Sequence, residues 1–223
     1  MSFNIAIDGP AGAGKSTIAK RASRELSFIY VDTGAMYRTI ALGLLRKNTN
    51  IEDDSELTEA LQEIEVGIRY VNGEQHVYLN GEDVSDLIRT EKVSDMTSRS
   101  SAKPQVRAKL TWLQRELAGK ENVLMDGRDI GTMILPNADL KIYLTASVAT
   151  RAHRRYLELR ERGNDCSIEE ITKDIRERDY RDMHRETAPL RQAEDAVLLD
   201  SSDMSIEEVV AEIVKLTRER MCS

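Results

Sequence analysis

The sequence has little of what secreted, membrane-spanning or metal-clustered proteins need. It contains 2 cysteines, Cys166 and Cys222. Because they lie far apart in the sequence, they form neither a disulfide framework nor a metal-binding pattern. No apolar run is long enough to span a bilayer, and no signal peptide is recognisable. We therefore expect a cytoplasmic protein whose two thiols stay reduced.

Aromatic residues are also scarce, at 4%, and the formal net charge is -7. An acidic chain has no general affinity for nucleic acid or for an anionic membrane, and few aromatic rings are available to stack on bases. Among the basic residues, arginine outnumbers lysine by about two to one, and 10 arginines fall between Arg151 and Arg191. Because a planar guanidinium suits bidentate contacts with phosphate, this stretch is a candidate phosphate-contacting region.

A glycine-rich loop follows the first short apolar run. Gly9, Gly14, Lys15 and Ser16 match the phosphate-binding pattern of two glycines five residues apart followed by Lys and Ser. Glycines let the backbone amides converge on an anion, the lysine adds positive charge for the β- and γ-phosphates, and the serine hydroxyl can ligate Mg²⁺. A helix expected at Ser16–Leu26 directs its positive end at the same anion. The sequence predicts a nucleoside triphosphate site made of Gly9, Pro10, Ala11, Gly12, Ala13, Gly14, Lys15, Ser16 and Thr17.

Four further apolar runs are short enough to be buried strands, and helical patterns separate them. We expect strands at 28–32, 123–126, 140–145 and 197–199, and helices near 35–46, 55–62, 91–98, 104–117, 148–183 and 205–220. Strands that alternate with helices predict an α/β fold with a five-stranded parallel sheet covered by helices on both faces. Ligands of such sheets lie beyond the carboxyl ends of the strands, which brings 9–16, 32–34 and 126–129 to one edge.

Two segments depart from this alternation. Residues 64–84 alternate apolar and polar side chains and contain Asn72-Gly73 and Asn80-Gly81, which indicate three antiparallel strands near 64–71, 75–80 and 82–84. We interpret 63–99 as a lobe inserted into a core formed by 1–62 and 100–223. The second segment, 148–188, is Arg-rich and predicts a charged helical lid with little core of its own, broken near Gly163-Asn164.

Charged side chains occur at several predicted strand and helix ends. Asp126 ends an apolar strand, where phosphate-loop enzymes hold the carboxylate that orients Mg²⁺, although an Asp before a Gly also begins turns. Arg128 and Asp129 are adjacent on the following loop, where a ligand contact explains them better than strand packing does. Arg38, near a helix start, could clamp a phosphate or simply be solvated.

Arg178, Asp182 and Arg185 share one face of a predicted helix. Such a face is either a salt-bridged surface or a set of cations that neutralise a transferring phosphoryl group. The histidines, His76, His153 and His184, have no spacing typical of metal ligands.

The motifs GPAGAGKST, DTGAMYR, DGRDIGT and ERDYRD…APL, in this order and with the β-meander insert, resemble those of the bacterial cytidylate kinases. The resemblance covers almost the whole chain. It implies that the γ-phosphoryl group of ATP is transferred to CMP or dCMP with Mg²⁺ as cofactor. It also implies a monomer with a sheet core, a monophosphate-binding insert and a closing lid. From the acidic charge we expect that this protein binds neither nucleic acid nor membrane.

The same resemblance implies roles for individual residues. Ser98, Arg107 and Asp129 would contact cytosine; Thr33, Arg178 and Asp182 would lie near the sugar; and Arg38, Arg128 and Arg185 would hold the acceptor phosphate. Tyr37, in the second motif, is a further candidate for substrate binding. The predicted catalytic residues are Lys15, Arg128, Arg178 and Arg185, and the predicted metal ligands are Ser16 and Asp126.

Three other functions remain open at this point. One is a nucleic-acid-processing NTPase, although the acidic charge and the few aromatic rings argue against it. A related kinase could take UMP, AMP or a metabolite hydroxyl, but residues 126–129 read DGRD rather than the DG(F/Y)PR run typical of adenylate kinases. A nucleotide-dependent switch that transfers no phosphate is the alternative from another class. The sequence has no Asn-Lys-x-Asp motif for reading guanine, which weakens the interpretation as a GTPase.

Overall fold

The computed structural model describes residues 2–161, 163 and 165–222. Their contacts divide the chain into two compact units. Unit 1 comprises Met1–Ile29 and Glu121–Ser223, and unit 2 comprises Tyr30–Lys120. Among the described helices, none has both the length and the apolar character required to cross a membrane.

A five-stranded sheet forms the centre of the fold. Its strand order is β2-β6-β1-β7-β8, with β1 at Asn4–Asp8, β2 at Ile29–Asp32, β6 at Val123–Gly127, β7 at Leu140–Thr145 and β8 at Val197–Asp200. Within unit 1, β1 pairs in parallel with β6 and β7, and β7 pairs in parallel with β8. Every residue of β6 and the last four of β1 are buried, which requires cover on both faces of these strands. The predicted α/β fold with a covered parallel sheet is confirmed.

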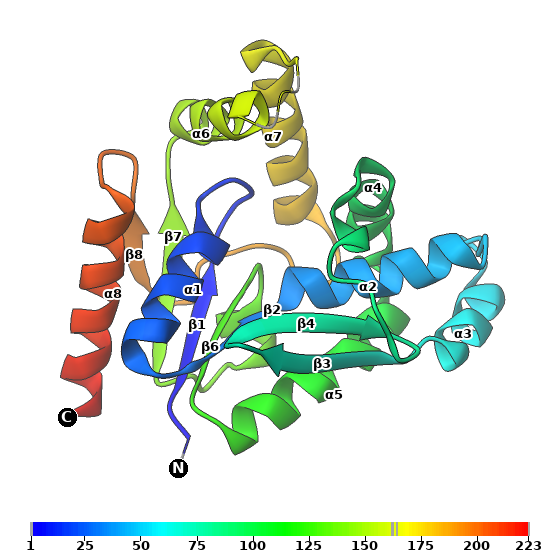
Figure 1. Ribbon diagram of the computed structural model, residues 1–223, viewed down its shortest axis with the longest axis horizontal. Coiled ribbons are helices and arrows are strands. Elements are labelled where there is room, and N and C mark those ends of the chain that lie inside the picture. Colours follow the sequence, from blue (N-terminus) through cyan, green and yellow to red (C-terminus); the bar gives the residue numbers. More distant parts are fainter. Residues whose placement is uncertain (1, 162, 164, 223) are drawn as a thin grey trace. The chain divides into compact units, whose positions relative to one another are not determined.

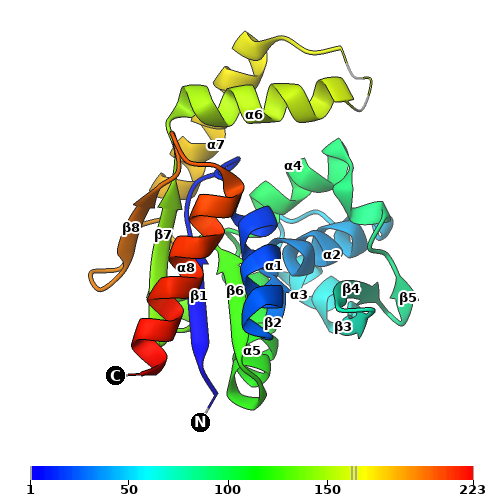
Figure 2. The ribbon, with the colours of Figure 1, turned by 60° about the vertical axis from the view of Figure 1, so that its left-hand side comes forward.

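Two helices of unit 1 lie side by side along this sheet (Figure 2). Helix α1, Lys15–Leu26, buries Ile18 and Ala22, and helix α8, Ile206–Met221, buries Val209 and Ile213. A capping box, in which the Ser205 and Glu208 side chains each bind the other's backbone amide, begins α8. Contacts of α1 with β1 and β6, and of α8 with β7, place both helices against this sheet.

The Arg-rich stretch forms a helical hairpin. Helix α6 spans Val148–Glu161, and helix α7 spans Ile168–His184. They share a small apolar core in which Ala152, Ile171 and Ile175 are buried, as expected for a charged hairpin with little core of its own. Of the predicted break, Gly163 has the positive φ of 76° that suits glycine, whereas Asn164 lies outside the described residues.

Unit 2 combines helices with the predicted meander (Figure 1). Its strands β3, β4 and β5 at Val66–Val71, Glu74–Leu79 and Glu82–Asp83 are antiparallel, and both residues of Asn72-Gly73 and Asn80-Gly81 have positive φ, as type I′ turns require. The helices are α2 Thr33–Arg46, α3 Asp54–Glu63, η1 Leu87–Arg89, α4 Glu91–Ser100 and α5 Pro104–Lys120. Because α2 packs against α4 and β4, unit 2 is wider than the lobe predicted at 63–99. The predicted domain bounds therefore stay a prediction.

Two helices that have an aspartate cap begin slightly before their predicted starts. Helix α2 begins at Thr33 rather than Ala35, because the Asp32 carboxylate accepts the backbone N–H of Ala35 at 2.9 Å. Helix α3 begins at Asp54, since Asp53 accepts the amides of Ser55 and Glu56. The substrate candidate Thr33 thus stands in a first helical turn and not in a free turn.

Candidate active site

The glycine-rich loop joins the end of β1 to the start of α1. Gly14 is the N-cap of α1, with φ 82°, and its carbonyl accepts the amide of Ile18 at 3.0 Å. Gly9 has φ 155°, and a Cβ there would lie 1.9 Å from the carbonyl oxygen of Leu144 on β7. Only glycine allows the chain to leave β1 so close to the neighbouring strand.

We expect Gly9→Ala to weaken ATP binding by about tenfold or more, because the added methyl group overlaps backbone that cannot move as a side chain can. Nucleotide titration and thermal unfolding measure the effect. Gly119→Ala is the matched control, since it lies in α5 and its Cβ would meet nothing within 4 Å. ATP affinity in Gly9→Ala equal to that of the control would contradict the steric argument.

The side chain of Lys15 lies inside the loop. The residue is 6% exposed, and its Nζ donates to the carbonyl oxygens of Gly9 and Pro10, each at 2.8 Å. Burial, and next the positive charge of Arg128, lowers the pKa of Lys15, while Asp126 acts in the opposite direction. The loop thus carries a buried amine whose charge a polyphosphate would stabilise.

Ser16 and Asp126 meet at the same edge of the sheet. Ser16 Oγ donates to Asp126 Oδ2 at 3.0 Å, and Asp126, the last but one residue of buried strand β6, is 4% exposed. Hydroxyl and carboxylate oxygens are hard donors that suit Mg²⁺, which commonly takes its other ligands from phosphates and water. No group of three His, Cys, Asp or Glu among the described residues could hold a metal alone. The pair fits an ion that arrives with a polyphosphate.

Two ion pairs join the loop after β6 to the end of α7. Arg128 Nε donates to Asp182 Oδ2 at 2.9 Å, and Arg185 Nη2 lies 3.3 Å from Asp129 Oδ1. Burial acts to raise the pKa of Asp182, but the charges of Arg128, Arg178 and Arg185 outweigh it and hold that pKa below its usual range. Besides burial, the positive charge of Arg178 also lowers the pKa of Lys15. The four predicted catalytic residues are therefore gathered in unit 1.

In unit 2, the candidates on α2 and α5 lie close together. The Arg107 guanidinium is 5.7 Å from the centre of the Tyr37 ring, and its Nη1 donates to the Ser101 carbonyl at 3.2 Å. Arg38 Nη1 lies 3.3 Å from where a Cβ on Gly34 would stand, so the guanidinium folds over the first turn of α2. Two further substrate candidates also lie in unit 2. Thr33 is buried in the first turn of α2, and Ser98 is half-buried on α4.

One residue near the phosphate loop was not singled out by the sequence. Arg151 is 4% exposed; its guanidinium donates to the carbonyls of Ala11 and Ala146 and lies 2.7 Å from Asp179 Oδ2. It therefore ties the loop to β7 and α7. Nothing in the spacing of the 10 arginines distinguishes Arg151 from the other nine, so no sequence signal could have found it.

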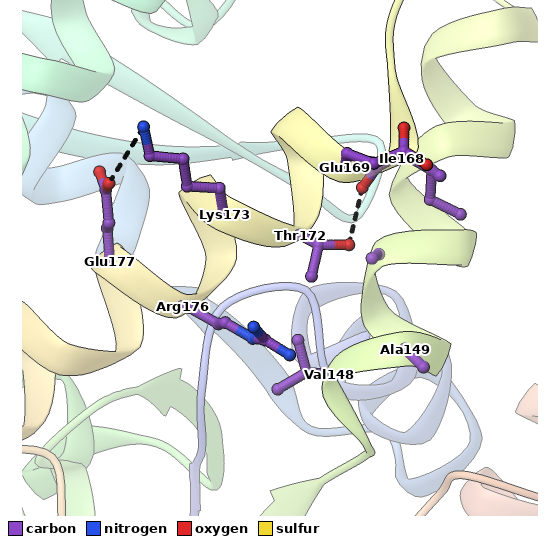
Figure 3. Close-up of a pocket in the computed structure, with 9 residues that line it drawn as sticks. Val148, Ala149, Ile168, Glu169, Thr172, Lys173, Arg176 and Glu177 are labelled. Atoms are coloured by element: carbon purple, nitrogen blue, oxygen red, sulfur yellow. Dashed lines mark hydrogen bonds and ion pairs between the residues drawn. The ribbon is translucent and has the colours of Figure 1, made fainter.

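The α6–α7 hairpin also contains a pocket of about 540 Å³ (Figure 3). Val148, Ala149, Ala152 and Ile168 form its apolar lining, and the polar lining consists of Glu169, Thr172, Lys173, Arg176 and Glu177. Lys173 and Glu177 face each other across one turn of α7, 3.9 Å apart. None of the predicted site residues lines this pocket.

Comparison with known proteins identifies the family. The family model described as Cytidylate kinase matches residues 5–219. The chain belongs to the cytidylate kinase family. It is 49% identical over 214 residues to the cytidylate kinase of Caldicellulosiruptor bescii, covering 96% of this chain and 95% of the relative. It is 48% identical over 218 residues to that of Ligilactobacillus salivarius, covering 98% and 97%.

Solved structures support the fold. An uncharacterised protein from Eubacterium ventriosum has a TM-score of 0.52 at 12% identity, covering 98% of this chain and 99% of its own. At that identity the likeness concerns the fold alone. The resemblance to cytidylate kinases predicted from four motifs is confirmed by the family match and the curated relatives.

Proposed function

We propose that this protein transfers the γ-phosphoryl group of ATP to CMP or dCMP, forming CDP or dCDP and ADP. The observation that carries the proposal is the match of the cytidylate kinase model to residues 5–219. The glycine-rich loop supports it, because a buried lysine and a helix N-terminus there suit a triphosphate donor. Relatives over nearly the whole chain are named for the same activity.

In the proposed donor site, residues 9–17 surround the phosphates of ATP. Backbone amides and Lys15 bind phosphate oxygens, and Ser16 and Asp126 would hold Mg²⁺. When bound there, the ion would supply positive charge that stabilises the oxygens of the transferring phosphoryl group. The protein's own part is to fix the phosphates in position before the reaction.

The acceptor needs no general base, because a nucleotide phosphate is already ionised near pH 7 and its oxygen is the nucleophile. We assign the acceptor phosphate to Arg38, Arg128 and Arg185, and the sugar to Thr33, Arg178 and Asp182. We assign cytosine binding to Ser98, Arg107 and Asp129, and Tyr37 lies beside Arg107. The ring nitrogen and carbonyl of cytosine accept hydrogen bonds while its amino group donates, so an Arg and an Asp together match that edge. Lys15 and the arginines near α7 stabilise the negative charge of the transferring phosphoryl group.

A coupled assay of ADP formation with Mg²⁺, ATP and each nucleoside monophosphate in turn tests this function. We expect turnover with CMP and dCMP, and product analysis should show the corresponding diphosphate. Equal or faster turnover with UMP or AMP would favour another nucleoside monophosphate kinase. Tight ATP binding without transfer to any acceptor would favour the nucleotide switch.

Asp129→Ala should reduce the preference for CMP over UMP, because the carboxylate is assigned to the amino group that uracil lacks. The measurement is the ratio of kcat/KM for the two acceptors, and we expect it to fall about tenfold or more. Asp165→Ala, which removes a fully exposed carboxylate, is the control. An unchanged ratio in Asp129→Ala would show that the base lies elsewhere.

The proposal also includes a monomeric, cytoplasmic enzyme that binds nucleotides and neither nucleic acid nor membrane. The net charge of -7 supports this, since it disfavours polyanionic partners. Light scattering should give the mass of one chain with and without CMP. A stable mass of two chains would contradict the monomer.

A further inference from the structure

Asp8 binds two consecutive backbone amides. It is the last residue of β1, directly before Gly9, and it is 5% exposed. Its Oδ1 accepts the N–H of Ile130 at 2.8 Å, and its Oδ2 accepts the N–H of Gly131 at 2.7 Å. Both carboxylate oxygens of this one side chain are therefore used to hold another segment of unit 1.

That segment begins directly after Arg128 and Asp129. Ile130–Ile134 forms η2, a single turn of π-helix, and the Asp129 carbonyl accepts the amides of Met133 and Ile134. The first amides of a helical turn have no partner within the turn, so Asp8 supplies partners that η2 itself cannot. The conformation of Asp129, with φ -146° and ψ 25°, is thereby fixed from its C-terminal side.

Gly131 allows the approach. A Cβ on this residue would lie 3.1 Å from Lys141 Cδ and 3.4 Å from Asp8 Oδ2. The carboxylate and the η2 backbone are consequently packed without room for a side chain between them.

Keeping Asp8 ionised has an energetic cost. Burial raises the pKa of Asp8 to about 6, with Asp129 acting in the same direction, while the two amides and Lys15 lower it. Tyr143 on β7 also interacts with it, and burial together with the charge of Asp8 raises the pKa of Tyr143. Since the folded-state pKa lies above the ordinary 3.8, the destabilisation appears as pH rises from 3.8 through about 6, and it is fully present at pH 7. The two bonds to η2 are therefore made by a carboxylate that burial makes costly to ionise.

We propose that Asp8 is a positioning residue for acceptor recognition, which fixes Asp129 and Arg128 to the strand that carries the phosphate loop. The link runs from Asp8 through two amides to the residues assigned to cytosine and the acceptor phosphate. The expected kinetic effect of this link rests on the proposed function, whereas the hydrogen bonds that form the link do not depend on it.

Asp8→Asn is the direct test, because it preserves size while replacing one acceptor oxygen with an NH₂ group that faces an N–H. We expect KM for CMP to rise about tenfold and the preference for CMP over UMP to fall, while KM for ATP changes less than about twofold. Asp53→Asn is the matched control, since Asp53 also accepts two consecutive amides, at the exposed start of α3. It should leave all three values unchanged.

Gly131→Ala places a methyl group against the Asp8 carboxylate. It should also raise KM for CMP and lower the preference for CMP over UMP. Equal changes in the KM values for ATP and CMP would overturn the proposal in favour of a role in the phosphate loop. Unchanged values in Asp8→Asn would overturn it as well.

Hydrogen exchange separates this inference from the proposed function. The amides of Ile130 and Gly131 should exchange about tenfold or more faster in Asp8→Asn than in the parent protein, whichever nucleotide is the substrate. Unchanged exchange would contradict the link itself. If the parent protein does not phosphorylate CMP, the function fails while the exchange result still decides the link.

Discussion

Lys15→Ala is expected to lower kcat for phosphoryl transfer by about 10³-fold or more in a protein that remains folded. The amine is the positive side chain inside the glycine-rich loop, held 2.8 Å from two loop carbonyls. An interaction with phosphate oxygens that strengthens as charge moves to the leaving group acts on the transition state more than on binding. The measurement is kcat at saturating ATP and CMP.

The fold should tolerate this substitution because the buried ammonium already opposes folding. Burial lowers the pKa of Lys15, which means that its charged form is disfavoured in the folded state. Lys215→Ala, at an exposed position on α8, is the control for kcat and for the thermal midpoint. A Lys15→Ala enzyme with kcat within about tenfold of the control would show that the loop does not hold the reacting phosphates.

The parts of this site that could be predicted are those with local causes. The loop from Gly9 to Lys15 is recognisable because a tight turn, an anion and a helix start require glycines and a lysine at fixed spacing. The paired turns Asn72-Gly73 and Asn80-Gly81 were predictable for the same reason, since type I′ turns need positive φ at both residues.

The parts that were not predicted depend on partners far apart in the chain. Asp8 binds amides 122 and 123 residues away, and Arg151 binds a carbonyl 140 residues away. Asp8 shared one signal with Asp126, an Asp at the end of an apolar strand. The π-helical turn η2 gave no signal in the sequence, because five residues are too few to show a helical period.

The sequence signal for domain bounds is also local, and the predicted bounds stay a prediction. The alternating segment at 64–84 marks where the meander lies, but it does not show which helices pack against it. The contacts of α2 with α4 and β4 do so, and they assign Tyr30–Lys120 to one unit.

Arg128→Ala and Arg185→Ala should each lower kcat by about 10³-fold, as expected for arginines that neutralise a transferring phosphoryl group. Both guanidinium groups are mostly buried and fixed on carboxylates, so they are oriented before any substrate binds. Arg155→Ala, which breaks an exposed pair with Glu158 on α6, is the control and should retain normal rates.

A double-mutant cycle decides whether Arg128 acts on phosphate or only on its partner. If Arg128 served only to hold Asp182, Asp182→Asn would reproduce the loss and the double variant would be no slower than either single variant. If Arg128 contacts the phosphoryl group, Arg128→Ala should still cost about 10³-fold in the Asp182→Asn background. We expect the second result, because Arg128 Nη2 is not needed for the bond to Asp182, which Nε makes.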